Sequence, residues 1–326
     1  MYNSEKNHSR YSRQILLNEI GQEGQALLQT KKVAIIGIGA LGTVAAELLA
    51  RAGIGSLLLI DREVVEESNL QRQTLFDEKD LGKSKAMAAE KRIAAINSKI
   101  QVESQAIHLS SESIQTLETA DLILDCTDNL QTRFLINDYC KKEKKIWIYA
   151  AAIKTSGYVM PIFPGGPCLQ CFLTESNLET CDTVGVLNTI TVSIASLQAT
   201  LALKVLLGKE IESALYHYDI WNQNFKKLKI VPKENCPTCR GNYAHLEQKK
   251  TSKYVRFCST GKYQILGNQK VDLAKIKERW EKIGKVTGDN TLLQFQDITL
   301  FKDGRALINA NSAEEAEAVY SKLVGN

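Results

Sequence analysis

Three features are missing from this sequence, and each absence narrows the class of protein that it can encode. No apolar run approaches the roughly 20 residues that a membrane-spanning helix needs. The N-terminus, MYNSEKNHSRYSRQ, lacks the apolar core of a secretory signal peptide. The net charge is only +4, from 41 Lys and Arg against 37 Asp and Glu, which is too small to argue for nucleic-acid or membrane binding. We therefore expect a cytoplasmic globular protein.

The eight cysteines carry a second kind of information, because four of them form two Cys-x-x-Cys pairs. Disulfides are rare in the cytoplasm, so the pairs indicate a metal site instead. Cys168 with Cys171, and Cys236 with Cys239, can supply the four thiolates of a tetrahedral structural zinc site. The 64 residues between the pairs exceed the common spacing, so the fold must bring them together. A redox role and a chance occurrence are the alternatives.

The clearest signal lies between Lys31 and Arg72. Val33 to Ile36 has the composition of a buried parallel strand. GIGALG (residues 37–42) follows, then a stretch of helical composition, then a second apolar strand, Ser56 to Ile60, that ends in Asp61. This order is the context of a dinucleotide-binding turn, in which glycines let the backbone approach a phosphate and a helix N-terminus supplies free N–H groups. Asp61 is placed to accept from ribose hydroxyls. A tight turn without a ligand is the alternative.

The residues that follow Asp61 indicate which nucleotide chemistry to expect. An NAD-dependent enzyme needs no special sequence here, but this chain continues as DREVVEESNLQRQ (residues 61–73). Arg72 can donate two hydrogen bonds to a phosphate, and Asn69 and Gln73 can add neutral donors. GIGALG and DREVVEESNLQRQ together closely resemble the adenylating enzymes of the ThiF/MoeB/HesA family, bacterial relatives of ubiquitin-activating enzymes. The resemblance covers about residues 8 to 240.

The resemblance implies an α/β fold with a Rossmann-like, doubly wound and mostly parallel sheet and a structural zinc. It also implies a reaction, in which a small ubiquitin-like sulfur-carrier protein of the ThiS or MoaD type presents its C-terminal Gly-Gly to ATP. The carrier carboxylate attacks the α-phosphate, pyrophosphate leaves, and a carrier acyl-adenylate forms. A ThiS-type carrier means thiamine thiazole synthesis and a MoaD-type carrier means molybdopterin synthesis. The sequence favours neither.

By the same resemblance, charged residues neutralise the phosphates. The family's RYxRQ segment reaches into the partner's nucleotide site in a homodimer, which assigns Arg13 to the ATP phosphates. Read without the family, Arg13 belongs to a solvated helix face. Arg72 and Lys85, the lysine of the family's GxxKA segment, contact the nucleotide. Asp128, in DxTDNxxxR, is the magnesium and transition-state residue. Capping of the following helix by Asp128 or Asn129 is the alternative.

Two further expectations complete the site. The segment DLGKSKA (residues 80–86) lacks the GxxxxGK[ST] spacing, so the ATP site is not a P-loop. Cys181 matches a cysteine that in some family members handles the activated carrier as a thioester or persulfide; a spare cysteine is the alternative. The expected ATP-binding residues are Gly37, Gly39, Ala40, Gly42, Asp61, Asn69, Arg72, Gln73, Lys85, Asp128, Asn129 and Arg133.

The rest of the chain is predicted in outline. We expect strands over Ile100 to Ala106, Leu122 to Leu124 and Ile146 to Ala152, a long apolar helix over Ile190 to Leu207, and strands over 215–220 and 225–230. Ala150 to Ala152 would leave room for a slender peptide tail.

The predicted domains are an adenylating domain over 1–240, a linker over 241–252 and a small α+β domain over 253–326. In the last, Asp303-Gly304 predicts a hairpin and Ser312 to Glu315 a capping box. Its expected role is carrier docking or dimer support.

Other classes of function fit parts of the pattern. An NAD(P)-dependent oxidoreductase would use the same glycine-rich turn, but it leaves Arg72, Lys85 and the cysteine pairs unexplained. A non-catalytic zinc scaffold would keep the fold without turnover, although the intact set of Arg13, Arg72, Lys85 and Asp128 argues against it. A tRNA-modifying relative has little support, because the sequence has no basic stripe.

Overall fold

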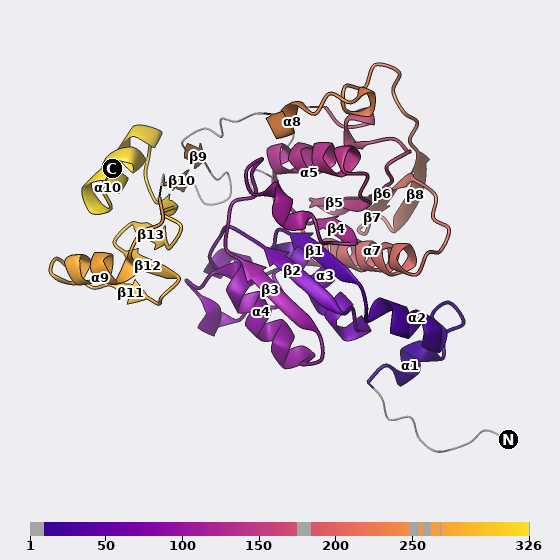
Figure 1. Cartoon of the computed structure of the whole chain (residues 1–326), viewed down its shortest axis with the longest axis horizontal. Helices are drawn as coiled ribbons and strands as arrows, with labels where there is room; N and C mark the ends of the chain where they lie inside the picture. Colours follow the sequence, from indigo (N-terminus) through magenta and orange to yellow (C-terminus); the bar gives the residue numbers. More distant parts are fainter. Residues whose placement is uncertain (1–9, 175–183, 248–253, 257–261, 268, 326) are drawn as a thin grey trace. The chain divides into compact units, whose positions relative to one another are not determined.

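The structure is a computed structural model that describes residues 10–174, 184–247, 254–256, 262–267 and 269–325. It divides into two compact units, residues 1–247 and 248–326. The first contains an eight-stranded sheet and the second a six-stranded sheet (Figure 1). The division falls within the linker expected over 241–252, whose limits stay a prediction.

The sheet of the first unit has the strand order β3-β2-β1-β4-β5-β6-β7-β8. Five neighbouring strands are parallel: β3 (Gln101–Gln105), β2 (Ser56–Ile60), β1 (Lys32–Ile36), β4 (Leu122–Asp125) and β5 (Trp147–Ile153). Three antiparallel strands continue the sheet: β6 (Ser156–Ile162), β7 (Ala214–Asp219) and β8 (Asn224–Lys229). The order 3-2-1-4-5 is that of a doubly wound fold, which binds ligands at the carboxyl ends of β1 and β4. The predicted fold class is confirmed.

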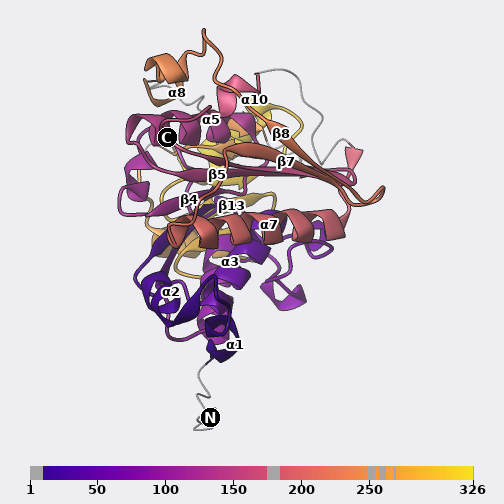
Figure 2. The same ribbon diagram turned by 90° about the vertical axis from the view of Figure 1, so that its right-hand side faces the viewer.

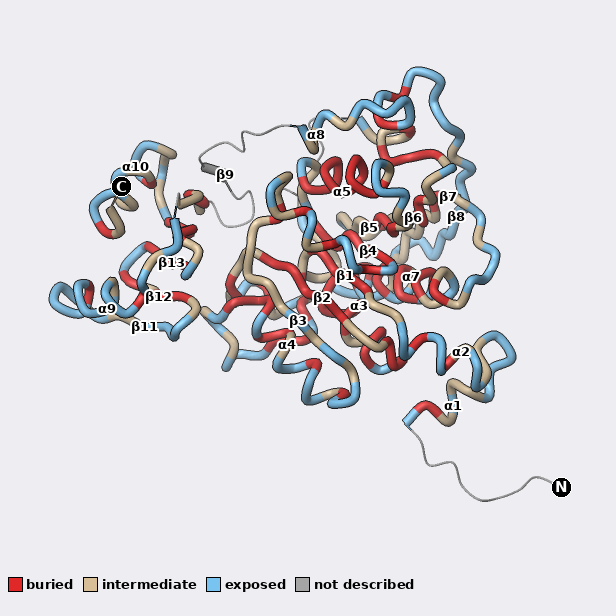
Figure 3. Tube along the Cα trace, viewed as in Figure 1, coloured by how far each residue is buried: buried red, intermediate tan, exposed pale blue. Residues whose placement is uncertain are grey.

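Helices cover both faces of this sheet (Figure 2). The face that carries Ile35 and Leu59 packs against α3 (Ala40–Ala52), α4 (Lys85–Ile96) and α7 (Asn188–Leu206). The opposite face, with Ile36 and Leu58, packs against α5 (Leu130–Lys142) and the short helix Ile114–Leu117. Because both faces are covered, β1 and β2 read as continuous apolar runs, and they are buried along most of their length (Figure 3).

The helix α7 corrects the expectation that no apolar run approaches the length of a membrane-spanning helix. Among the described residues, it is the one helix that is long and apolar enough, at 19 residues, to cross a membrane by length and composition. Half of its most apolar window is nevertheless buried inside the first unit, where it contacts α3, β5 and β6. A helix that packs in the core of a globular unit can have this composition, because its buried faces meet apolar neighbours.

Shorter elements connect the main ones in the first unit. They are α1 (Ser12–Ile15), α2 (Gly21–Leu28), α8 (Ala244–Glu247) and the 3₁₀ helices Glu67–Asn69, Glu78–Asp80, Leu169–Cys171 and Thr238–Arg240. The strand β6 is absent from the sequence prediction, although its neighbours lie within two residues of their predicted limits. It returns antiparallel to β5 and so ends the parallel part of the sheet.

The second unit is a small α+β domain, as predicted. Its strands have the order β11-β12-β13-β14-β10-β9 and are all antiparallel. They are β9 (Tyr254–Arg256), β10 (Tyr263–Ile265), β11 (Thr287–Gly288), β12 (Leu292–Phe295), β13 (Ile298–Phe301) and β14 (Ala306–Ile308). Both α9 (Leu273–Glu281) and α10 (Ala313–Leu323) pack on one core, in which Trp280 stacks on Phe295.

The turn predicted at Asp303-Gly304 is confirmed, whereas the predicted capping box is formed only in half, because the Glu315 carboxylate accepts from the amide of Asn311, at 2.7 Å, and not from that of Ser312. Gly304, with φ +88°, lies in the turn between β13 and β14, where a Cβ would lie 2.1 Å from the oxygen of Gln269. Ser312 caps α10 by accepting a hydrogen bond from the Glu315 amide at 3.2 Å.

Candidate nucleotide site and cysteine cluster

The glycine-rich turn joins β1 to α3. Gly37 has φ +86°, and a Cβ at this position would lie 2.7 Å from the carbonyl oxygen of Cys126. A Cβ at Gly42 would lie 1.9 Å from the carbonyl oxygen of Gly37. Both positions therefore require glycine. Gly39 directly precedes Ala40, the first residue of α3, whose first-turn N–H groups have no partner within the helix. The turn thus presents free backbone donors at the strand ends, as an anion site requires.

Asp61 follows β2 and holds this turn in place. Its Oδ2 accepts a hydrogen bond from the amide of Ile38 at 2.6 Å, and its Oδ1 accepts one from the amide of Glu63 at 2.7 Å. Burial raises the pKa of Asp61, and Lys85 partly offsets this rise. The carboxylate is therefore part of the frame of the turn, and its predicted contact with a ribose stays a prediction.

Lys85 begins α4 and is buried beside two carboxylates. Its Nζ donates to Glu63 Oε2 at 2.7 Å. Burial lowers the pKa of Lys85, but Glu63, Asp61 and, to a smaller extent, Asp128 raise it further, so the net shift is upward. The structure thus brings Lys85, Asp61 and Asp128 into one electrostatic neighbourhood. Glu63 is missing from the sequence prediction, although its spacing from Asp61, two residues along an extended segment, was a signal for it.

The polar string after β2 folds over the turn. Asn69 closes the short helix Glu67–Asn69, because its Oδ1 accepts from the amide of Glu66 at 3.1 Å. Arg72 is half-buried and donates to the carbonyl oxygen of Ser68 at 2.9 Å. Gln73 is buried, and its Nε2 would lie 3.8 Å from a Cβ on Gly39. Its Oε1 has no hydrogen-bond partner among the described residues, so an unsatisfied acceptor lies beside the turn.

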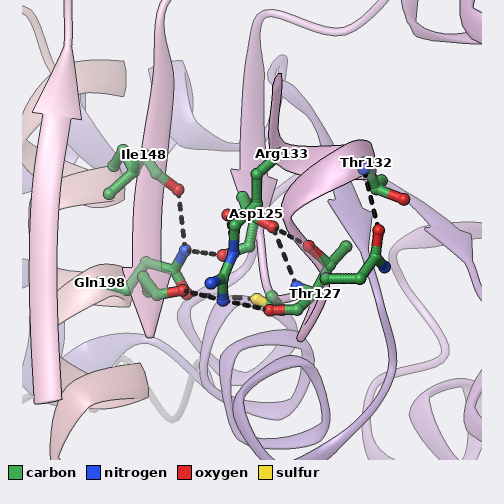
Figure 4. Close-up of polar contacts among 9 residues, drawn as sticks. Asp125, Thr127, Thr132, Arg133, Ile148 and Gln198 are labelled. Atoms are coloured by element: carbon green, nitrogen blue, oxygen red, sulfur yellow. Dashed lines mark hydrogen bonds and ion pairs between the residues drawn. The ribbon is translucent and has the colours of Figure 1, made fainter. Parts of the chain in front are cut away.

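The loop after β4, which begins beyond Asp125 (Figure 4), carries the predicted magnesium residue at the same edge of the sheet. Asp128 is exposed. Asn129 is the N-cap of α5, and its Oδ1 accepts from the amide of Thr132 at 2.8 Å, so the helix cap is Asn129 rather than Asp128. Arg133 is buried and forms an ion pair with Asp125, with 3.2 Å between Nε and Oδ2. Its expected contact with ATP stays a prediction, because its guanidinium already bonds within the protein.

Arg13 lies in a segment that is anchored on both sides. The buried Tyr11 accepts a hydrogen bond from Asn97 Nδ2 at 2.9 Å on its hydroxyl, and Gln14 Nε2 donates to Gln25 Oε1 at 2.7 Å. Arg13 itself is exposed between these anchors. Its action across a dimer interface stays a prediction. Cys181 lies outside the described residues.

The two cysteine pairs meet, although 64 residues separate them in sequence. The sulfurs of Cys168, Cys171, Cys236 and Cys239 all lie within 4.8 Å of one another. Three of the separations are 3.4, 3.9 and 3.6 Å. Metal–sulfur bonds of about 2.3 Å place tetrahedral ligands about 3.8 Å apart, so the four residues can hold a metal ion. We call them the cysteine cluster.

The cysteine cluster is fixed to the C-terminal half of α5. Asn137 Oδ1 accepts from the amide of Leu169 in the first pair at 2.8 Å. Asp138 Oδ1 accepts from the hydroxyl of Thr238 in the second pair at 2.7 Å, and that hydroxyl also contacts Gln170 Oε1 at 2.9 Å. Burial raises the pKa of Asp138, an effect that the hydrogen bond from Thr238 reduces. Helix α5 therefore connects the Asp128 loop at its start to the cysteine cluster near its end.

Comparisons with known proteins agree with this arrangement. The ThiF family model matches residues 11–238. The sulfur carrier protein ThiS adenylyltransferase of Bacillus subtilis is 35% identical over 97% of this chain and 99% of its own length. The protein of the same name from Escherichia coli is 37% identical over 74% of this chain and 98% of its own length. Among solved structures, E. coli MccB with ATP superposes with a TM-score of 0.65 at 24% identity, covering 73% of this chain and 75% of MccB; this likeness concerns the fold.

Proposed function

The chain belongs to the ThiF family, and from this membership we propose that it is an adenylyltransferase that activates the C-terminal glycine of a ubiquitin-like sulfur carrier with ATP. One observation carries the proposal beyond the family. The glycine turn, Asp61, Lys85 and the Asp128 loop converge at the carboxyl ends of β1, β2 and β4; we call them the strand-end site. This is where a doubly wound sheet binds a nucleotide.

The proposed reaction forms one bond and breaks one. The terminal carboxylate oxygen of the carrier bonds to the α-phosphorus of ATP, and the bond from that phosphorus to the bridging oxygen of the β-phosphate breaks, so that pyrophosphate leaves with its electron pair. No proton transfer is required, so the protein must supply alignment and cationic charge. Lys85 and Arg72 supply charge from the same chain, and Arg13 supplies it from the partner in a proposed homodimer.

Lys85 is suited to this task because its position and charge are set before ATP binds. The hydrogen bond to Glu63 fixes its Nζ, and the upward shift of its pKa keeps it protonated at neutral pH. Arg72 contrasts with it, since among the described residues its guanidinium donates to one backbone carbonyl, that of Ser68. We propose that Arg72 exchanges this contact for a phosphate oxygen.

The donor atoms at the strand ends fit a magnesium ion. Mg²⁺ takes one or two carboxylates and otherwise phosphate oxygens and water. Both oxygens of Asp61 bond to backbone amides, whereas the Asp128 carboxylate is exposed and has the chemistry to hold the ion. When bound, magnesium supplies positive charge against the phosphates.

The cysteine cluster fits zinc in a structural role. Four cysteine sulfurs close the coordination sphere of a tetrahedral ion and leave no position for a substrate. We propose that this zinc fastens the segment after β6 to the segment after β8. We also propose that Cys181 serves as a second nucleophile toward the acyl-adenylate. We further propose that the protein is cytoplasmic, because ATP and free thiols are both present in that compartment.

ATP–pyrophosphate exchange tests the proposed function. The purified protein with Mg²⁺ would be incubated separately with the ThiS-type and the MoaD-type carrier of the same cell. We expect exchange with the ThiS-type carrier, because the relative from B. subtilis that carries this name matches nearly the full chain, including the second unit. Exchange with the MoaD-type carrier alone would move the protein to the molybdopterin pathway, and exchange with both would indicate a shared activator. Exchange with neither would contradict the proposed function.

A further inference from the structure

Gln198 is a polar residue in an apolar position. It lies in α7 and is fully buried, and its helix neighbours Ile194, Ala195, Ala199 and Ala202 all belong to the hydrophobic core. A buried amide is costly unless every donor and acceptor is paired. The residue therefore needs a reason to be there that packing does not supply.

The side chain of Gln198 bonds across two strands (Figure 4). Its Nε2 donates to the carbonyl oxygen of Asp125, at the end of β4, at 2.9 Å, and to that of Ile148, on β5, at 3.0 Å. Its Oε1 accepts from Cys126 Sγ at 3.2 Å. One amide thus bridges two neighbouring strands and the first residue of the loop that carries Asp128.

The bridge lies where the backbone pairing of these strands ends. The register of β4 and β5 contains only the pairs Ile123–Trp147 and Leu124–Ile148. Past Leu124, this register contains no further backbone pair among the described residues, and the side chain of Gln198 bonds to both strands at this point. The two strands lead to Asp128 on one side and to Ala150 to Ala152 on the other.

A second side chain secures the same loop from the opposite face of the sheet. Arg133, on α5, pairs with Asp125 and donates through Nη2 to the carbonyl oxygens of Thr127 and of Ala150, the latter at 3.2 Å. Gln198 and Arg133 therefore hold both the Asp128 loop and β5, one from each helical layer (Figure 4). Asn129 fixes the far end of the loop by capping α5.

We propose that Gln198 is a positioning residue for adenylation, which sets the separation between the Asp128 loop and the end of β5 and thereby aligns the carrier carboxylate with the α-phosphate. This inference rests on the proposed function. In-line attack is sensitive to alignment, because a displacement of about 1 Å can cost about 100-fold in rate. Lys85, the cation expected to contact the phosphates, begins α4 and bonds to Glu63, and none of the hydrogen bonds of Gln198 reaches either residue.

The variant Gln198→Met tests the inference, because methionine has a similar length and neither donates nor accepts strongly. Thr191→Val is the matched control: Thr191 is also buried on α7, but its hydroxyl donates only to Asn188 in the same helix, at 2.6 Å. Exchange would be measured with the carrier that supports wild-type exchange. We expect kcat to fall at least tenfold in Gln198→Met with the KM for ATP within threefold of wild type, and both constants within twofold in Thr191→Val.

The outcomes separate this inference from the proposed function. Wild type without exchange would overturn both. Wild type with exchange and Gln198→Met within twofold of it would overturn the positioning role alone, as would a rise in KM for ATP with kcat unchanged. If Gln198→Met does not fold, Gln198→Glu replaces it, since a protonated glutamate can donate one of the two bonds. Its kcat relative to wild type should then increase as the pH is lowered, and a ratio that does not change with pH would overturn the inference.

Discussion

The two ends of α5 meet polar clusters that are balanced in different ways. At its start, two buried cations have anionic partners in the chain: Arg133 of α5 pairs with Asp125, and Lys85 of the strand-end site pairs with Glu63. Near its end, four cysteine sulfurs gather within 4.8 Å, and the nearby Asp138 is bonded to Thr238. Each of these two buried cations therefore has a protein anion beside it, whereas four thiolates need a divalent cation. We therefore expect the buried ion pairs to form without a metal and the cysteine cluster to depend on one.

Removal of one of the four proposed zinc ligands should have the largest effect and tests this difference. We expect Cys236→Ser to lose its metal and to unfold at least about 10 °C below wild type, because structural zinc contributes folding free energy directly. Metal content by elemental analysis and thermal unfolding would check this. Glu234→Gln, an exposed change in the same segment, serves as control and should match wild type. A metal-free Cys236→Ser with wild-type thermal stability would show that the cluster does not depend on an ion.

Asp128→Ala should affect activity without affecting the fold. The side chain is exposed, so its loss should change stability by less than about 0.5 kcal/mol. The exchange rate should fall about 1000-fold, or about 4 kcal/mol, if this carboxylate holds the magnesium. Gln131→Ala, at another exposed residue in the first turn of α5, is the matched control. Retained exchange in Asp128→Ala, with zinc content unchanged, would remove Asp128 from the mechanism.

Asp125→Asn tests whether the buried charge of Arg133 depends on its partner Asp125. The substitution leaves the buried Arg133 without a charged partner, and breaking such a pair costs about 3–5 kcal/mol. The surface pair Arg51–Glu47, at 2.7 Å, gives the comparison, since Glu47→Gln should cost less than about 1 kcal/mol. Urea unfolding would measure both. Equal losses in the two variants would mean that Asp125 and Arg133 do not depend on each other.

The smallest expected effect is the pH dependence of the unfolding free energy that Lys85 contributes. Glu63 and Asp61 raise its pKa above the ordinary 10.5 in the folded state, against the effect of burial. Above pH 10.5 the unfolded chain therefore releases this proton first, and the stability contributed by Lys85 is lost as the pH rises through the folded pKa. The difference in unfolding free energy between wild type and Lys85→Met should be constant up to about pH 9 and decrease above it. A difference that stays constant to high pH would contradict the shift.

Local motifs account for the part of the fold that could be predicted. The turn of residues 37–42 and the segment 61–73 are each one continuous stretch of sequence. Each directly follows a predicted strand, so its position at the end of that strand could be predicted. The strand β6 was missed because Gly157 and Pro161 disfavour a strand. The structure explains why both residues occur in this strand. Gly157 is required because a Cβ there would lie 2.3 Å from Ile194. Pro161 is tolerated because it lies beyond the pairing with β7, which ends at Val159.

The prediction of the site was likewise limited to what local motifs show. Lys85 and Asp128 were assigned by motif, and the structure brings them near each other, but their roles stay predictions. Gln198 was read as part of an apolar helix, because its partners lie 73 and 50 residues away in sequence. No local pattern records a contact of that range. The meeting of the cysteine pairs was predictable, because thiol pairs at this spacing indicate a shared ion.

The central claim is that the strand-end site transfers AMP to the end of a carrier protein. Intact-mass spectrometry of the ThiS-type carrier, after incubation with the protein, ATP and Mg²⁺, tests it most directly. We predict that the carrier gains one AMP at its C-terminal glycine, and that the adduct is absent with Asp128→Ala. An unmodified carrier in the presence of a protein that binds ATP and contains its zinc would contradict the account.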